Sequence, residues 1–112
     1  MAEQDKTLLA YVGTYNRERE EGIYLYHLDL ASGALSPVDA VSGVKNPSFL
    51  ALGPESRFLY AVSEMQELDG KPGGGVSAFA IDSGTGSLSP LNQQSSQGAG
   101  PCHLSVDQTG RF

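Results

Sequence analysis

The chain has 112 residues, which is at most one ordinary domain. Its 13 acidic and 7 basic residues give a net charge of −6, which argues against nucleic acid and anionic membrane surfaces as partners, because both select for a basic patch. The single cysteine, Cys102, excludes an intrachain disulfide framework and a cysteine-rich zinc site.

The N-terminal residues do not resemble a secretory signal. Residues 1–6 carry acidic side chains, and the apolar run that follows, Leu8 to Val12, is shorter than the ~7–15 residues of a signal core. No stretch approaches the ~18 apolar residues of a membrane span. We therefore expect a cytoplasmic protein with residues 1–7 as a tail.

The rest of the chain repeats itself. Residues 22–29 match residues 75–82 at an offset of 53, and residues 47–52 match residues 101–106 at an offset of 54. A period of this length is typical of stacked supersecondary units, so it predicts a repeat architecture.

Each repeat contains short β-forming runs separated by turn residues. We expect strands at 8–14, 22–29 and 35–41 in the first repeat, and at 48–52, 58–63, 76–81 and 88–94 in the second. Four antiparallel strands at this period are the pattern of a β-propeller blade. The predicted fold is all-β, with a first blade at 8–41, a complete second blade at 47–94 and the start of a third at 101–112.

A propeller closes with about 4–8 blades, and this chain supplies about two. The repeat count therefore predicts the N-terminal part of a longer protein or a truncated product. Strand edges without a partner favour self-association in such a piece.

Several segments resemble the lactonase family of seven-bladed propellers, which includes 6-phosphogluconolactonases and 3-carboxy-cis,cis-muconate cyclases. The resemblance runs in order from about Leu8 to Phe112 and is most specific in Asn46-Pro-Ser-Phe-Leu50 and Gly98-Ala-Gly-Pro-Cys-His103. It implies hydrolysis of a sugar lactone, 6-phospho-D-glucono-1,5-lactone, by the full-length parent. Three alternatives stay open: a muconate-type cyclase, a non-catalytic propeller that presents its loops to a protein partner, and an inactive fragment.

Three residues are candidates for the site. His103 opens the innermost strand of the third blade, and an imidazole there can activate water or stabilise an oxyanion at neutral pH. Glu64 follows the second strand of blade two, opposite Thr14 of blade one, and could orient His103 or bind a sugar hydroxyl. Asn46 could bind substrate or hold its own turn.

Other residue types predict less. We expect Cys102 to be a small buried apolar residue. No metal site and no cofactor are expected, because two histidines 76 residues apart without paired carboxylates do not form a ligand set. The charged run 16–21 is expected to be a solvated loop. A phosphosugar would need cations, which this chain offers mostly in loops and turns, so most phosphate contacts are expected from other blades.

Overall fold

The computed structural model describes residues 6–17 and 20–112, so positions 1–5 of the predicted tail and positions 18 and 19 of the predicted loop 16–21 lie outside the described residues. The described residues form antiparallel β-sheets and one short 3₁₀ turn, η1 (Pro54–Ser56). None of them belongs to a helix long and apolar enough to cross a membrane.

The first sheet has the strand order β1-β2-β3. Its strands are β1 (Thr7–Gly13), β2 (Ile23–Asp29) and β3 (Leu35–Val41). All three were predicted from the sequence to within one residue at each end. A bulge between Leu25 and Tyr26 shifts the pairing of β2 with β3.

The second sheet has four strands in the order β4-β5-β8-β9. They are β4 (Leu50–Leu52), β5 (Phe58–Ser63), β8 (Gly75–Ile81) and β9 (Leu88–Ser95). A two-stranded ribbon, β6 (Glu67–Leu68) with β7 (Lys71–Pro72), interrupts the segment between β5 and β8. The sequence predicted the four-stranded order and did not predict the ribbon.

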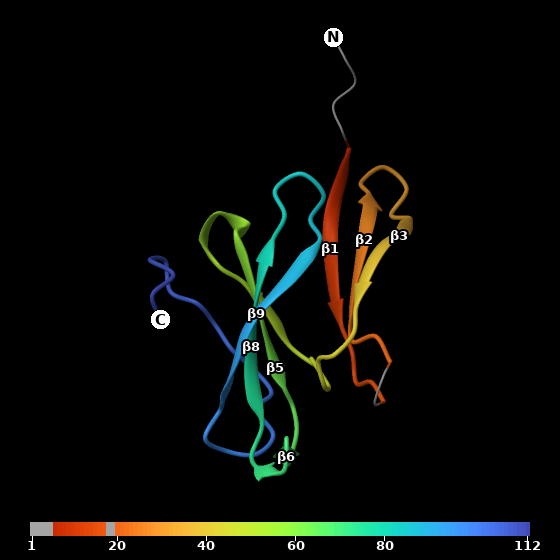
Figure 1. The fold of residues 1–112 in the computed structure, drawn as a ribbon. Coiled ribbons are helices and arrows are strands. Elements are labelled where there is room, and N and C mark those ends of the chain that lie inside the picture. The colour runs from red at the N-terminus through yellow and green to blue at the C-terminus, as the bar shows by residue number, and fades with distance from the viewer. Residues whose placement is uncertain (1–5, 18–19) are drawn as a thin grey trace.

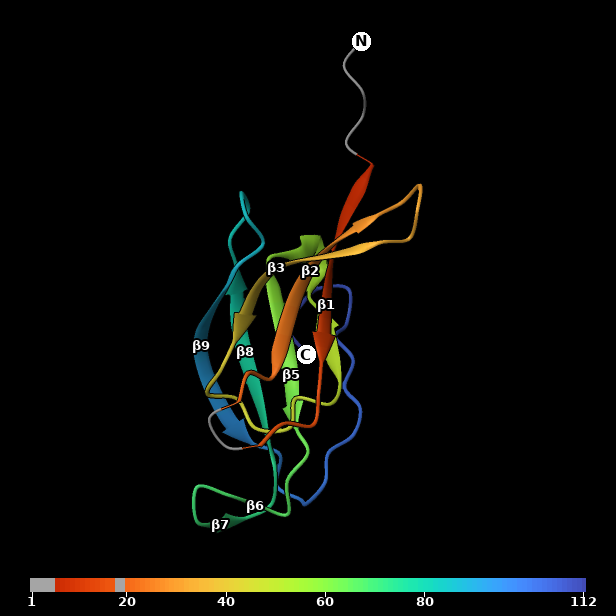
Figure 2. The same cartoon turned by 90° about the vertical axis from the view of Figure 1, so that its right-hand side faces the viewer.

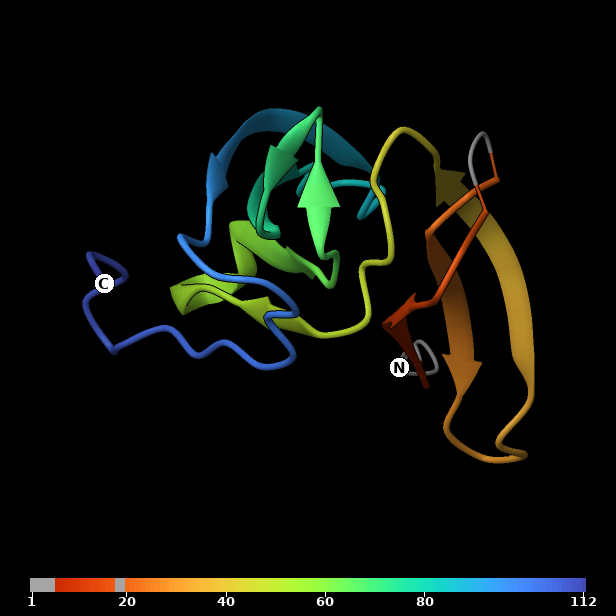
Figure 3. The same ribbon diagram turned by 90° about the horizontal axis from the view of Figure 1, so that it is seen from below.

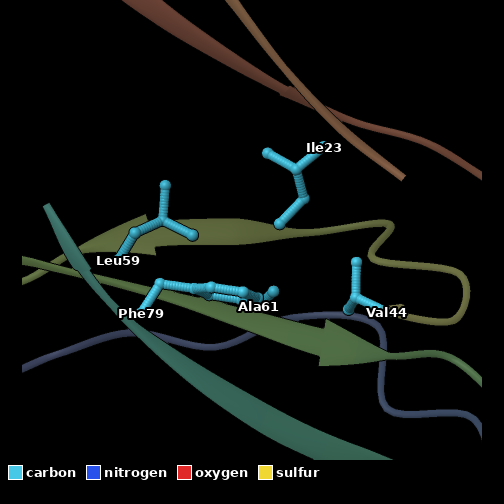
Figure 4. Close-up of a cluster of buried hydrophobic side chains, with 5 residues drawn as sticks. All are labelled: Ile23, Val44, Leu59, Ala61 and Phe79. Carbon is cyan, nitrogen blue, oxygen red and sulfur yellow. The ribbon is translucent and has the colours of Figure 1, made fainter. Parts of the chain in front are cut away.

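The two sheets pack face to face (Figures 1 and 2). Five buried apolar residues form the core between them, as Figure 4 shows: Ile23, Val44, Leu59, Ala61 and Phe79. Ile23 comes from the first sheet and points toward the side chains of the second, while Val44 belongs to the linker between the sheets. Burial of apolar surface at this junction is the main force that holds the two sheets together.

Hydrogen bonds and close backbone packing fix how the sheets meet. The Tyr11 hydroxyl donates to the carbonyl oxygen of Gly86 over 2.5 Å, and Ser87 Oγ donates to Asp39 Oδ2 over 3.0 Å. Gly13, at the end of β1, approaches the backbone of Pro47 so closely that a Cβ atom there would clash with the Pro47 carbonyl oxygen. The junction therefore requires glycine at that position.

Candidate functional site

A cluster of polar and aromatic side chains lies where β1 and β5 end and the segment before β4 begins. This is the lower end of the sheets in Figure 1 and the end that faces the viewer in Figure 3. Tyr15 lies two residues after β1, Ser48 and Phe49 precede β4, and Glu64 directly follows β5. Loops at one end of a sheet stack are where propellers and other repeat proteins place functional side chains.

Glu64 is held by two hydroxyl groups from different segments. Its Oε1 atom accepts a hydrogen bond from the Tyr15 hydroxyl over 2.7 Å and another from Ser48 Oγ over 2.6 Å. Hydrogen bonds from hydroxyls to an ionised carboxylate are short and strong, which agrees with both distances. The carboxylate thereby connects the segment after β1 to the segment before β4, and within the described residues its Oε2 atom accepts no hydrogen bond.

These bonds set the protonation states of both partners. The Ser48 hydroxyl, followed by the Tyr15 hydroxyl, lowers the pKa of Glu64 below its usual value, because both donate to the charged form. The hydrogen bond to Glu64 raises the pKa of Tyr15, with desolvation as the next cause. At neutral pH Glu64 is therefore an anionic acceptor and Tyr15 a neutral donor.

Tyr15 and Glu64 occupy equivalent positions of the two repeats. The prediction that Thr14 is the equivalent of Glu64 is wrong by one residue. Ile23 and Val76 are equivalent at the repeat offset of 53, and their partners across the sheets are Gly13 and Val62. Gly13 and Val62 are therefore equivalent, and two residues further along the chain come Tyr15 and Glu64. The bond between Tyr15 and Glu64 therefore joins the same position of neighbouring blades.

His103 also meets its equivalent in the preceding repeat. Phe49 and His103 lie 54 residues apart in matched segments, and their rings are in contact, with centroids 4.4 Å apart and planes inclined at 43°. The imidazole is exposed, and it is connected to the cluster through Phe49, which directly follows Ser48 in the chain. In the described part of the chain Glu64 bonds to Tyr15 and Ser48 and not to His103, so its predicted role of orienting His103 has no hydrogen bond to support it.

Asn46 holds the junction together through a reciprocal pair with Asn16. The Asn46 N–H donates to Asn16 Oδ1 over 2.7 Å, and the Asn16 N–H donates to Asn46 Oδ1 over 3.0 Å. Asn46 has a φ of 45°, a left-handed conformation that asparagine tolerates better than most residues. Its carbonyl oxygen accepts the Glu64 N–H over 3.1 Å. These contacts match the turn-holding alternative, and substrate binding by Asn46 stays a prediction.

The segment after Pro101 differs from the prediction. Residues 101–107 form no strand within the described residues, although the sequence predicted an innermost strand there. In the second sheet the equivalent segment pairs with β5, which starts at Phe58, and the match to Phe58 in the next repeat is Phe112. The described chain therefore offers residues 101–107 no partner strand.

The same absence of a neighbouring strand explains a second correction. Cys102, predicted to be buried, is exposed. It occupies the position of Ser48 in the next repeat, 54 residues further on. His27, the other histidine, is exposed on β2, toward the end of that strand opposite the cluster.

Sequence reasoning missed Tyr15 and Ser48. Ser48 lies inside the specific motif Asn46-Pro-Ser-Phe-Leu50, but a serine after proline has no signature of its own. The repeat points to Tyr15 as the equivalent of Glu64 when β1 and β5 are aligned at the correct register. Neither residue type suggests an acid-binding role until the fold brings its hydroxyl to Glu64.

Removing either hydroxyl should raise the pKa of Glu64 toward its usual value of 4.5. We expect a larger rise for Ser48→Ala than for Tyr15→Phe, because the Ser48 bond is the stronger cause. Carbon-detected NMR titration of the Glu64 carboxyl in the folded protein measures both, with Tyr26→Phe as control. An unchanged pKa in both variants would show that the two bonds are absent in solution.

The same bonds make a small contribution to stability that depends on pH. The folded-state pKa of Glu64 lies below the unfolded value, so the contribution is present above about 4.5 and is lost as the pH falls through the lower, folded-state value. Because the group is exposed, solvent screening keeps the effect small.

Metal binding finds no support among the residues described. Within residues 6–17 and 20–112, no group of three or more His, Cys, Asp or Glu side chains is placed to hold a metal ion. The chemistry that the cluster offers is that of an exposed imidazole, an anionic carboxylate and hydroxyl donors around an open end of the sheets.

Comparisons with known proteins agree with this architecture. A 6-phosphogluconolactonase of Bacillus subtilis is 38% identical over 104 residues, which are 93% of this chain and 28% of that protein. A solved structure from Bacteroides fragilis superposes with a TM-score of 0.82 at 34% identity and covers 96% of this chain and 29% of that one. A periplasmic gluconolactonase of Pseudomonas aeruginosa gives 0.79 at 30% identity, covering 94% and 29%.

The chain thus spans somewhat more than a quarter of the length of these relatives. Residues 9–112 match the family model described as lactonase, 7-bladed β-propeller. With this match and its two successive antiparallel sheets of three and four strands, the chain belongs to the seven-bladed β-propeller lactonase family.

Proposed function

We propose that this chain is part of a seven-bladed enzyme that hydrolyses 6-phospho-D-glucono-1,5-lactone to 6-phosphogluconate, a reaction of the pentose phosphate pathway. In this proposal residues 8–41 and 47–94 are the first two blades and residues 101–112 begin the third. The name of the Bacillus subtilis relative supports the substrate, and the repeat supports the blade assignment.

One observation carries the placement of the site: side chains at equivalent positions of successive repeats touch each other. Tyr15 donates a hydrogen bond to Glu64, and the rings of Phe49 and His103 are in tilted contact. In a ring of blades, equivalent positions of neighbours come closer together as they approach the central axis. Contact between them therefore supports a site at the mouth of the central channel, where propellers have room for a small ligand.

His103 is the group in this cluster suited to proton transfer. In the proposed reaction its imidazole takes a proton from water as the water oxygen attacks the lactone carbonyl carbon. The ring C–O bond then breaks, the ring oxygen receives the proton, and the acid ionises to the gluconate carboxylate. The alternative use of His103, as a donor to the oxyanion, needs the same position and keeps the proton on the imidazole.

Glu64 is better suited to binding than to proton abstraction. Two hydroxyl donors stabilise its anionic form, so it is a weak base. Its Oε2 atom can accept a hydrogen bond from a sugar hydroxyl, which is one of the two roles expected from the sequence. Asn46 supports this arrangement by accepting the backbone N–H of Glu64.

The test is a hydrolysis assay on the purified seven-bladed protein that carries this segment. We expect release of acid from 6-phosphoglucono-1,5-lactone well above the spontaneous rate, with a β-type circular dichroism spectrum from the same sample. Turnover of a carboxymuconate in its place would identify the cyclase instead. Absence of turnover on both, in a folded sample, would contradict an enzymatic role. The cytoplasmic location and the self-association expected from the sequence stay predictions.

A further inference from the structure

A cleft lined by two basic side chains lies next to Tyr15 and Asn46 in the chain. It has a volume of about 410 Å³ and lies between the loop after Tyr15 and the linker before Asn46. Arg17 lines it from the loop and Lys45 lines it from the linker. In a chain of net charge −6, two cations on one cleft are a local departure from the overall charge.

The hydrogen-bonded pair of Asn16 and Asn46 holds together the two segments that carry Arg17 and Lys45. Arg17 follows Asn16 directly, and Lys45 directly precedes Asn46. The reciprocal hydrogen bonds of 2.7 and 3.0 Å between the asparagines therefore fix the backbone next to both basic residues. Asn16 Nδ2 also donates to the Val44 carbonyl oxygen over 2.9 Å, which fixes the linker further.

Among the described residues, no carboxylate pairs with either cation. Within the described residues neither the Arg17 guanidinium nor the Lys45 ammonium lies within 4.0 Å of a carboxylate oxygen. Among the described residues that line the cleft, the acidic group is Glu20, which uses its Oε1 atom to accept the Arg17 backbone N–H over 2.7 Å. The described side chains of the cleft thus present two positive charges against one negative charge.

We infer that this cleft binds a phosphomonoester, and that its ligand is the 6-phosphate of the lactone. Arginine presents a planar fork of N–H donors that matches phosphate oxygens, and lysine adds a compact positive charge. Both walls of the cleft connect directly to Glu64: Arg17 follows two residues after Tyr15, whose hydroxyl donates to Glu64, and Lys45 precedes Asn46, whose carbonyl oxygen accepts the Glu64 N–H. The inference rests on the proposed lactonase function and identifies which part of the substrate this chain recognises.

The experiment compares phosphorylated and unphosphorylated substrates in the seven-bladed protein. We expect the double variant Arg17→Gln, Lys45→Gln to raise KM for 6-phosphoglucono-1,5-lactone about 10- to 100-fold, because each lost charged contact weakens binding by about tenfold. Glucono-1,5-lactone, which lacks the phosphate, should keep its kcat/KM within about twofold. Lys71→Gln removes the same charge from β7, at the same end of the sheets and outside this cleft, and should change neither.

Equilibrium binding decides the inference independently of turnover. Calorimetry should show that the wild type binds 6-phosphogluconate more tightly than gluconate, that the double variant loses most of this preference, and that inorganic phosphate competes for the wild-type site. Equal losses for both ligands, or the same loss in Lys71→Gln, would overturn the phosphate assignment. If phosphate competes but the preference for 6-phosphogluconate is missing, the cleft takes a free phosphate and the substrate assignment is wrong. Failure of the wild type to hydrolyse either lactone would reject the proposed function while leaving these binding results to judge the cleft.

Discussion

Replacing His103 by alanine in the seven-bladed protein is expected to lower kcat/KM for lactone hydrolysis about 100- to 10,000-fold, the range that a general acid–base group contributes. The ring contacts Phe49 with the centroids 4.4 Å apart, and the residue is exposed, so the imidazole is accessible to a substrate. Loss of this aromatic contact costs about 1 kcal/mol, so the variant should still fold. Steady-state kinetics, corrected for spontaneous hydrolysis, measures the effect.

His27→Ala is the matched control, because His27 is the only other histidine in the chain and is exposed on β2. It should retain the kcat/KM of the wild type. Unchanged kcat/KM in His103→Ala as well would show that the imidazole does not take part.

A second variant separates the two chemical roles of His103. Glutamine keeps an N–H donor but cannot accept a proton from water. If His103 stabilises the oxyanion, His103→Gln should retain more activity than His103→Ala. If His103 is the base, both variants should be equally slow, and the acid limb of the pH profile of kcat/KM should disappear in both.

Much of the fold could be predicted because the repeat and the strand pattern agree. The alternation of β8 places Gly75, Ser77 and Phe79 on its buried face, and β5 has the predicted bounds. The short ribbon of β6 and β7 turns at Asp69-Gly70, both with positive φ. An Asp-Gly pair is a hairpin signal, and it could have predicted the ribbon in the segment between β5 and β8.

The site was only partly predictable, since it depends on register between repeats. The segment between β5 and β8 is longer than the equivalent segment between β1 and β2. A single sequence offset therefore cannot align both β5 with β1 and β8 with β2. A slip of one residue moves every side chain of a strand to the other face. Because of that slip, Thr14 is predicted as the equivalent of Glu64 in place of Tyr15, and the Tyr15 hydroxyl that donates to Glu64 is not identified. The sequence marked Glu64 and His103 by residue type and position, but only the fold shows what they contact.

The packing of Gly13 against Pro47 leads to the largest expected change in stability. In Gly13→Ala the added Cβ would overlap the carbonyl oxygen of Pro47, a backbone atom that cannot rotate away, and would lie 3.3 Å from its carbonyl carbon. Overpacking of this kind costs about 3 kcal/mol, and here it acts on the linker that carries Ser48 and Phe49 into the site. We therefore expect a lower free energy of unfolding together with reduced lactone turnover.

Gly98→Ala provides the control for the change in composition. Gly98 has no positive φ, and a Cβ there would meet nothing within 4 Å, so its stability should stay within about 0.5 kcal/mol of the wild type. Urea denaturation at matched protein concentration compares the three proteins, and a similar slope against urea shows that the folded and unfolded states are comparable. Equal midpoints for Gly13→Ala and Gly98→Ala would mean that the linker moves aside freely and that the two sheets are not held at a fixed distance by this contact.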